Sequence, residues 1–156
     1  MALETQSNWS AAARNWSLPL AWMALIFWFS TGSFSAANTA PLVDSILAQW
    51  FPTLAAAHIE TINLFIRKLG HWSEYFVLAI LVLRALDPSA RERSAARPAF
   101  ATMLWVFLYA ITDEFHQYFV PSRMASFTDV LLDTFGGLCG VFFLRLWQDM
   151  KQKKAR

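Results

Sequence analysis

The sequence predicts an all-α integral membrane protein, a four-transmembrane-helix bundle with an extra amphipathic helix between the first and second spans. Of the 156 residues, 56% are hydrophobic and only 15% are charged, whereas soluble domains carry about 25% charged residues. Four apolar stretches qualify as spans, because about 20 residues cross the hydrocarbon core of a bilayer. The length predicts a single domain, residues 1–156, without a separate soluble module.

The predicted spans cover about residues 16–34, 71–86, 99–119 and 127–147. The second span is the weakest on hydropathy, since its purely apolar part is limited to residues 75–83. A short span can thin the bilayer locally or pack within the bundle. The first span also resembles a cleavable signal peptide, because Arg14 precedes it and small residues follow it. Its many Trp and Phe residues favour a retained anchor.

The connection between the first two spans, residues 35–70, is divided by Pro41 and Pro52. Within it, residues 53–69 place apolar side chains at helical spacing, which predicts an amphipathic helix. Two interpretations stay open: the helix lies on the membrane surface, or it packs on the bundle as an ordinary core helix.

The distribution of basic residues predicts the orientation. With a cytoplasmic N-terminus, ten of the 13 Lys and Arg residues fall on the inner side, and only Arg67, Lys68 and Arg123 fall on the outer side. Cytoplasmic loops carry the excess of Lys and Arg. We therefore expect a multi-pass protein with both termini in the cytoplasm.

Polar side chains converge at the outer ends of three predicted spans. They are His71, Glu74 and Tyr75 in the second span, Asp113, Glu114, His116 and Gln117 in the third, and Asp129 and Asp133 in the fourth. Ionisable groups at membrane depth cost roughly 2.5–3.5 kcal/mol each, so they usually serve a function. A network that only fixes helix packing is the alternative.

Three chemistries fit these residue types. A divalent metal such as Zn, Mn or Fe could bind mixed His and carboxylate ligands, here His71, Glu74, Asp113, His116 and Asp129. His116 could form a general acid–base pair with Asp113 or Glu114. Lys68 and Arg123 could hold a phosphate or carboxylate of a lipid headgroup or cell-wall precursor. The excess of carboxylates argues against a purely anionic ligand without a metal.

Small residues in the fourth span predict close helix packing. Gly136 and Gly140 form a G-x-x-x-G pattern, which lets two helix backbones approach. The single cysteine, Cys139, lies in the same apolar stretch and cannot form an internal disulfide, so we expect it to pack.

Three blocks of this sequence resemble the VanZ-like family of bacterial membrane proteins. They are KLGHWSEY at residues 68–75, DEFHQYFVPSR at residues 113–123 and SFTDVLLDTFGGLCG at residues 126–140. Ser122 departs from the pattern, because the family commonly has Gly before this Arg. The resemblance implies roles for Lys68, His71, Tyr75, Asp113, Glu114, His116, Gln117, Pro121, Arg123, Asp129 and Asp133. Glu74 is supported mainly by its helical spacing.

The resemblance implies a location in the bacterial inner (cytoplasmic) membrane. The founding member of the family is associated with resistance to teicoplanin, a lipoglycopeptide that acts outside this membrane. We therefore expect a polar outer-leaflet site that binds or alters an envelope lipid or lipid-linked precursor, with an effect on lipoglycopeptide susceptibility. A membrane-embedded hydrolase or transferase, with or without a metal, is the first alternative. A structural or transport-helper protein is the second, and no nucleic-acid partner is expected.

Overall fold

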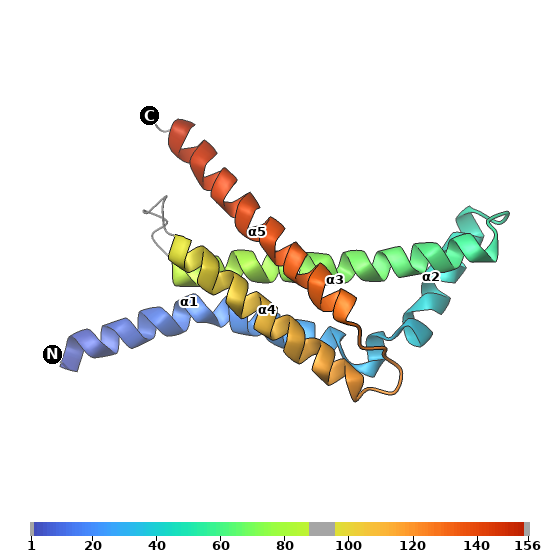
Figure 1. Cartoon of the computed structure of the whole chain (residues 1–156), viewed down its shortest axis with the longest axis horizontal. Helices are drawn as coiled ribbons and strands as arrows, with labels where there is room; N and C mark the ends of the chain where they lie inside the picture. Colours follow the sequence, from blue (N-terminus) through green and yellow to red (C-terminus); the bar gives the residue numbers. More distant parts are fainter. Residues whose placement is uncertain (1, 88–95, 155–156) are drawn as a thin grey trace.

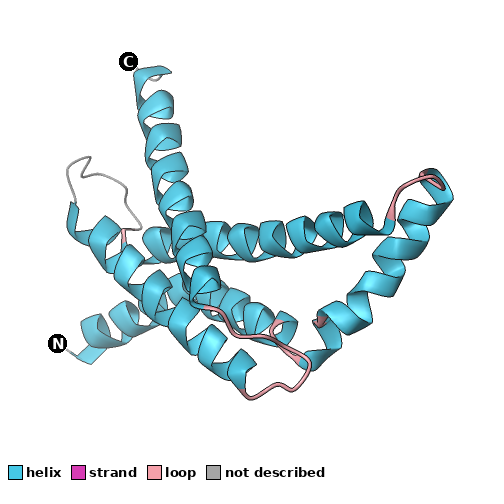
Figure 2. Ribbon diagram, turned by 45° about the vertical axis from the view of Figure 1, so that its right-hand side comes forward, coloured by secondary structure: helices cyan, strands magenta, loops and turns pink. Residues whose placement is uncertain are grey.

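The computed structural model describes residues 2–87 and 96–154, with side chains described from residue 13 onwards. Within these residues the chain is entirely helical, as predicted, and contains no strand. Its elements are α1 (Ala2–Phe29), the short 3-10 helix η1 (Gly32–Phe34), α2 (Ala36–Trp50), α3 (Ala56–Leu86), α4 (Ala96–Tyr118) and α5 (Phe127–Lys154) (Figures 1 and 2).

Two of the described helices, α3 and α5, are long and apolar enough to cross a membrane. The pair Ala13–Phe29 and Gly32–Trp50, bent by 67°, would provide a third span if it is counted as one. Helix α4 falls outside this set, since Asp113 and Glu114 near its C-terminal end lower its mean hydropathy. The described chain therefore has two or three candidate spans.

The first predicted span ends earlier than expected. Helix α1 stops at Phe29 instead of continuing to residue 34, and a turn leads into η1. Local hydrogen bonding explains why the helix ends here. The Thr31 hydroxyl donates to the carbonyl of Trp28 at 2.7 Å, and hydroxyl side chains compete with the helical backbone bonds in this way. Gly32 follows directly, and glycine weakens helix continuation.

The boundary predicted at residues 69–71 is wrong, because α3 runs without interruption from Ala56 to Leu86. Gly70 lies within this helix, where tertiary context outweighs its low helix propensity. The 31 residues of α3 extend for about 46 Å at 1.5 Å per residue. The separate helix between the first two spans is α2 instead, which ends before Pro52.

The first half of α3 is not an ordinary core segment. None of its side chains before Tyr75 is buried, and Leu64, Phe65 and Leu69 are at least half exposed. A hydrogen bond joins its polar face to α2: Asn63 of α3 donates to Asp44 Oδ1 of α2 at 2.6 Å. Apolar exposure of this size on a helix is typical of contact with lipid or a partner.

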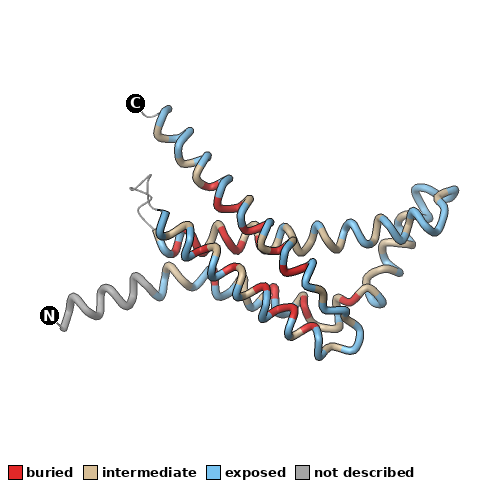
Figure 3. The backbone as a smooth tube through the Cα atoms, in the orientation of Figure 1, coloured by how far each residue is buried: buried red, intermediate tan, exposed pale blue. Residues whose placement is uncertain are grey.

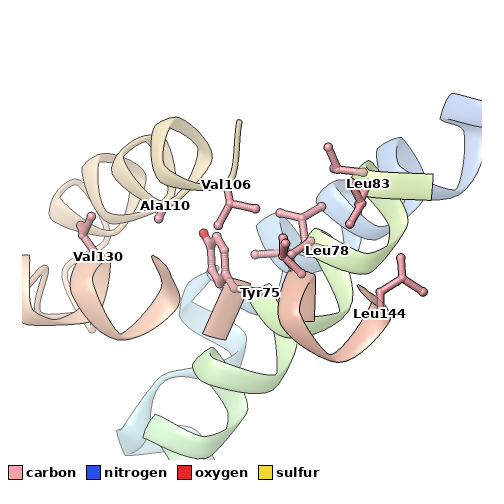
Figure 4. Packing of buried hydrophobic residues seen from close by; sticks show 11 residues of the cluster. Tyr75, Leu78, Leu83, Val106, Ala110, Val130 and Leu144 are labelled. Atoms are coloured by element: carbon pink, nitrogen blue, oxygen red, sulfur yellow. The ribbon is translucent and has the colours of Figure 1, made fainter. Parts of the chain in front are cut away.

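The core lies where the second half of α3 is crossed by α4 and α5 and flanked by α1 (Figures 1 and 3). Tyr75, Leu78 and Val82 of α3 and Val106 and Ala110 of α4 are completely buried there (Figure 4). Side-chain bonds tie α1 to this core. Trp22 Nε1 donates to the Glu74 carbonyl at 2.9 Å, and Tyr109 donates to the Met23 carbonyl at 2.6 Å.

Helices α3 and α5 pack backbone to backbone, which confirms the prediction made from the glycine pattern. A Cβ atom at Gly136 would overlap the carbonyl of Trp72, and one at Gly140 would overlap the carbonyl of Phe76. At Gly137 it would lie 2.6 Å from Val106 Cγ1 of α4. The three helices can therefore meet only while these positions lack side chains.

We predict that Gly136→Ala lowers stability by about 1–3 kcal/mol, because the new methyl group must push α5 away from α3. Gly70→Ala is the matched control, since no atom lies within 4 Å of the position of its Cβ. It should be neutral or stabilise by roughly 0.5–1 kcal/mol. Thermal unfolding of the purified protein in detergent measures both, and equal shifts for the two variants would contradict the packing argument.

Candidate functional site

A group of four ionisable side chains forms the centre of the site, and we call it the polar cluster: His71, Asp113, Glu114 and Asp133. They come from α3, α4 and α5. Each offers one nitrogen or carboxylate oxygen, and these four atoms all lie within 4.8 Å of one another. Three helix segments that are distant in sequence thus place their polar groups at one point.

The polar cluster is buried and poorly hydrogen-bonded. Asp113, Glu114 and Asp133 are 3%, 5% and 0% exposed. Among the described residues, Asp113 Oδ1, Glu114 Oε1, both Asp133 oxygens and His71 Nδ1 lack a hydrogen-bond partner. His71 Nδ1 and Asp133 Oδ1 approach to 3.5 Å, longer than a normal hydrogen bond. Such groups normally find partners, because a buried unsatisfied polar group costs about 1–3 kcal/mol.

Two carboxylates of the polar cluster each accept a hydrogen bond through the oxygen atom that is not among those without partners. Glu114 Oε2 accepts from the backbone N–H of Ser126 at 2.8 Å, just before α5 begins. Asp113 Oδ2 accepts from Gln117 Nε2 at 3.2 Å, one turn along α4. Each bond fixes the orientation of a carboxylate, so that the remaining oxygen of Asp113 and of Glu114 is left within the polar cluster.

Lys68 and Asp129 form an ion pair between α3 and α5 beside the polar cluster. Asp129 lies in the first turn of α5, where a negative charge also interacts favourably with the helix dipole. Both residues line a second cavity with Arg67, His71 and Ser126. Asp129 is therefore paired with a cation and is not in the polar cluster.

Arg123 holds the end of α1. Its guanidinium donates to the carbonyl of Phe29, the last residue of α1. It also donates to the carbonyl of Thr31, which accepts a further hydrogen bond from the N–H of Phe34. Burial lowers the pKa of Arg123, and the nearby charge of Arg67 lowers it further, whereas Asp113 and Glu74 act in the opposite direction. Its main contacts are structural, although it also borders the main cavity described below.

Tyr75 and His116 lie next to the polar cluster without belonging to it. The Tyr75 hydroxyl is fully buried without a hydrogen-bond partner among the described residues, and the side chain lies beside Val106 (Figure 4). His116 packs on Phe27 with ring centroids 4.4 Å apart, and its Nε2 is likewise buried without a partner. The predicted set His116, Asp113 and Glu114 is thus divided, since only the two acids share the polar cluster.

A cavity of about 300 Å³ opens between α3, α4 and the bent α1–α2 connection. We call it the main cavity because His71 and Asp113 of the polar cluster line it, although the second cavity is larger, at about 500 Å³. Its apolar lining residues are Ile26, Phe29, Phe34, Val43 and Ile66. The polar lining residues of the main cavity are Ser30, Thr39, Asn63, Arg67, His71, Glu74, Asp113, Gln117 and Arg123. The main cavity therefore combines an apolar surface, two guanidinium groups and two members of the polar cluster.

Sequence reasoning did not identify Arg67 as part of the site. Arg67 borders the main cavity, the second cavity and a further one beside α2. No hydrogen bond or ion pair is found for its side chain within the described residues. The sequence did contain a signal for it, because Arg67, His71 and Glu74 follow helical spacing on one face of α3. Ser30, Thr39 and Asn63 carried no such signal.

The fold and the site define the class of protein. It is a helical protein with candidate membrane spans and a buried cluster of His and carboxylate side chains beside a cavity with apolar and polar lining. The family follows from a family model described as VanZ/LLP1, which matches residues 16–148, and the chain belongs to this family. No curated protein matches the chain. No solved structure matches it either.

We predict that Arg123→Lys lowers stability by about 1.5–3 kcal/mol, the range for hydrogen bonds to charged groups. A single ammonium cannot reproduce the planar fork that reaches two carbonyls. Arg84→Lys, at an exposed position on α3, is the control and should change stability by less than about 0.5 kcal/mol. Thermal unfolding in one detergent compares them, and an unaffected Arg123→Lys would show that the α1 end does not need this residue.

Proposed function

We propose that this chain is a four-span protein of the bacterial cytoplasmic membrane with both termini inside. Its main cavity would bind an envelope lipid or lipid-linked precursor from the outer leaflet. The helix ends support this sidedness: the start of α1, the end of α3, the start of α4 and the end of α5 lie towards one side in Figure 1. The polar cluster and main cavity lie away from those ends, near the α4–α5 connection.

The composition of the main cavity carries the proposal. A lipid-linked phosphate has an apolar chain and an anionic headgroup, and the lining of the main cavity combines apolar side chains with Arg67 and Arg123. Arginine recognises phosphate through paired N–H donors. Arg67 has its donors available, whereas those of Arg123 are partly engaged with α1. Arg67 would therefore make the principal phosphate contact, and Glu74 and His71 would contact hydroxyl or amine groups.

An effect on teicoplanin susceptibility would follow from this binding. Teicoplanin acts outside the membrane, so a protein that sequesters or alters a precursor in the outer leaflet changes what the drug meets. Family membership supports this part of the proposal. The first test compares teicoplanin sensitivity of a susceptible bacterium expressing wild type or Arg67→Gln, and a protective effect that survives the substitution would contradict the assigned role of Arg67.

Lipid retention is expected to depend on Arg67. Native mass spectrometry of wild type released from nanodiscs should show a bound phospholipid or polyprenyl phosphate, and Arg67→Gln should reduce its occupancy about tenfold, the effect of roughly 1.4 kcal/mol. Arg84→Gln, at the opposite end of α3, is the matched control and should bind as wild type does. Equal occupancy in all three proteins would indicate only nonspecific annular lipid.

A membrane-embedded hydrolase or transferase is the second candidate, and the unpartnered oxygens of the polar cluster favour it. Buried carboxylates and a neighbouring imidazole provide acid–base groups, with Asp113 and Glu114 in the polar cluster and His116 one turn beyond Asp113. An enzyme should lose turnover of a lipid-linked phosphate in Asp113→Asn, Glu114→Gln or His116→Ala while its melting temperature is kept. Normal turnover in these variants would remove the catalytic role.

The structural or transport-helper alternative explains the Lys68–Asp129 pair and the bonds made by Glu114 and Arg123. It gives no reason for oxygens that are buried without partners. Under it, the same three substitutions would lower thermal stability and expression together, without any change in a bound lipid.

A further inference from the structure

We propose that the polar cluster is a binding site for one divalent transition-metal ion, with His71, Asp113, Glu114 and Asp133 as ligands. The inference stands on the geometry of these four residues and does not require that a lipid occupies the main cavity. It also differs from the ligand set expected from sequence, because Glu74, His116 and Asp129 lie outside the polar cluster. Asp129 is paired with Lys68, and the ring of His116 packs at a tilt against Phe27.

The spacing of the four donor atoms fits a metal. Zinc binds imidazole nitrogen at about 2.0–2.1 Å and carboxylate oxygen at about 2.0–2.2 Å, so neighbouring ligand atoms in its tetrahedral sites lie roughly 3.4 Å apart. The four donors all lie within 4.8 Å of one another. The donor atoms are thus close to the spacing that one ion requires, before any ion is bound.

Charge points to the same conclusion. The polar cluster holds three buried carboxyl groups. Asp133 approaches the imidazole of His71 within the cluster, while Lys68 is engaged with Asp129 and Arg123 with the end of α1. Among the described residues, no Lys or Arg forms an ion pair with Asp113, Glu114 or Asp133. Uncompensated buried charge is very costly, and a divalent cation removes that cost.

Asp133 provides an independent observation. It is completely buried, and among the described residues neither of its oxygens has a hydrogen-bond partner, His71 Nδ1 remaining 3.5 Å from Oδ1. Its role cannot be helix capping, because it lies a full turn beyond Asp129, inside α5. The Tyr75 hydroxyl is also buried without a hydrogen-bond partner among the residues that the structure describes. Apolar side chains would pack equally well at this point, so packing does not explain Asp133 and Tyr75. A bound cation that interacts with their oxygen atoms does.

The donor set selects the kind of metal. Calcium and magnesium prefer sites made only of oxygen, whereas imidazole with carboxylates suits Zn²⁺, Mn²⁺ or Fe²⁺. The ligands are also positioned in advance, since Ser126 and Gln117 hold the outer oxygens of Glu114 and Asp113. Hydrogen bonds of this kind orient metal ligands. Because His71 and Asp113 also line the main cavity, a metal held by them would lie next to any anion bound there.

The test uses the full chain, purified in detergent without chelators and then stripped and reloaded with Mn²⁺ or Zn²⁺ alone. Metal analysis should give about one ion per chain, and Mn²⁺ bound in the polar cluster should show an altered electron paramagnetic resonance spectrum. Asp133→Asn and His71→Ala should weaken binding by on the order of 100-fold or more, since each removes a ligand, a larger change than the loss of an orienting group.

Glu60→Gln and Asp44→Asn are the matched controls, because both acids lie outside the polar cluster beside α2, and they should bind as wild type does. Glu114→Gln keeps an acceptor for the N–H of Ser126, so it tests ligand loss in a chain expected to fold. Metal should raise the melting temperature of wild type but not of the ligand variants. Equal binding by Asp133→Asn and wild type, or no binding above the controls, would overturn the proposal.

The lipid measurement on the same preparations separates this proposal from the preceding one. Loss of metal with retained lipid would leave the main cavity as a binding site without a metal. Bound metal without any specific lipid would establish the site and contradict the lipid proposal alone.

Discussion

The close contact between α3 and α5 is the constraint on which the rest of the structure depends. Gly136 and Gly140 allow the α5 backbone to lie against the carbonyls of Trp72 and Phe76. Trp72 directly follows His71, and Asp133 lies one turn before Gly136. The contact that closes the core therefore also sets the approach of His71 to Asp133. A larger residue at either glycine would separate two members of the polar cluster as well as two helices.

Polar residues around the site fall into two groups with different physics. Lys68, Asp129 and Arg123 are satisfied by each other or by helix ends, and such partners offset part of the cost of burying a charge. The four residues of the polar cluster are not satisfied among the described residues. Stability alone does not explain them, because well-packed apolar side chains would be equally good or better there. Residues of both groups alternate within the same segments of the sequence, so only the three-dimensional structure shows which residue belongs to which group.

Much of this could be read from the sequence, and the exceptions have clear causes. The helical class, the convergence of three segments and the glycine contact follow from local periodicity and small residues. The end of α1 at Phe29 and the continuity of α3 through Gly70 do not. Hydropathy gives no sign of the Thr31 bond and the Arg123 contacts at the end of α1, and it marked Gly70 as a boundary although one glycine only weakens a helix. The division of Asp113 and Glu114 from His116 also escaped prediction, because helical spacing gives a shared face but not the rotation of a ring.

The length of α3 has a consequence for how deeply the site lies. If this helix enters the hydrocarbon region at Leu86, His71 stands about 22 Å along its axis, in a layer about 30 Å thick. The polar cluster would then sit several ångströms below the outer boundary, too deep for bulk water but within reach of a headgroup drawn slightly inward. Bilayer thickness would therefore control access to the site, so the same chain would present it differently in thin and thick membranes.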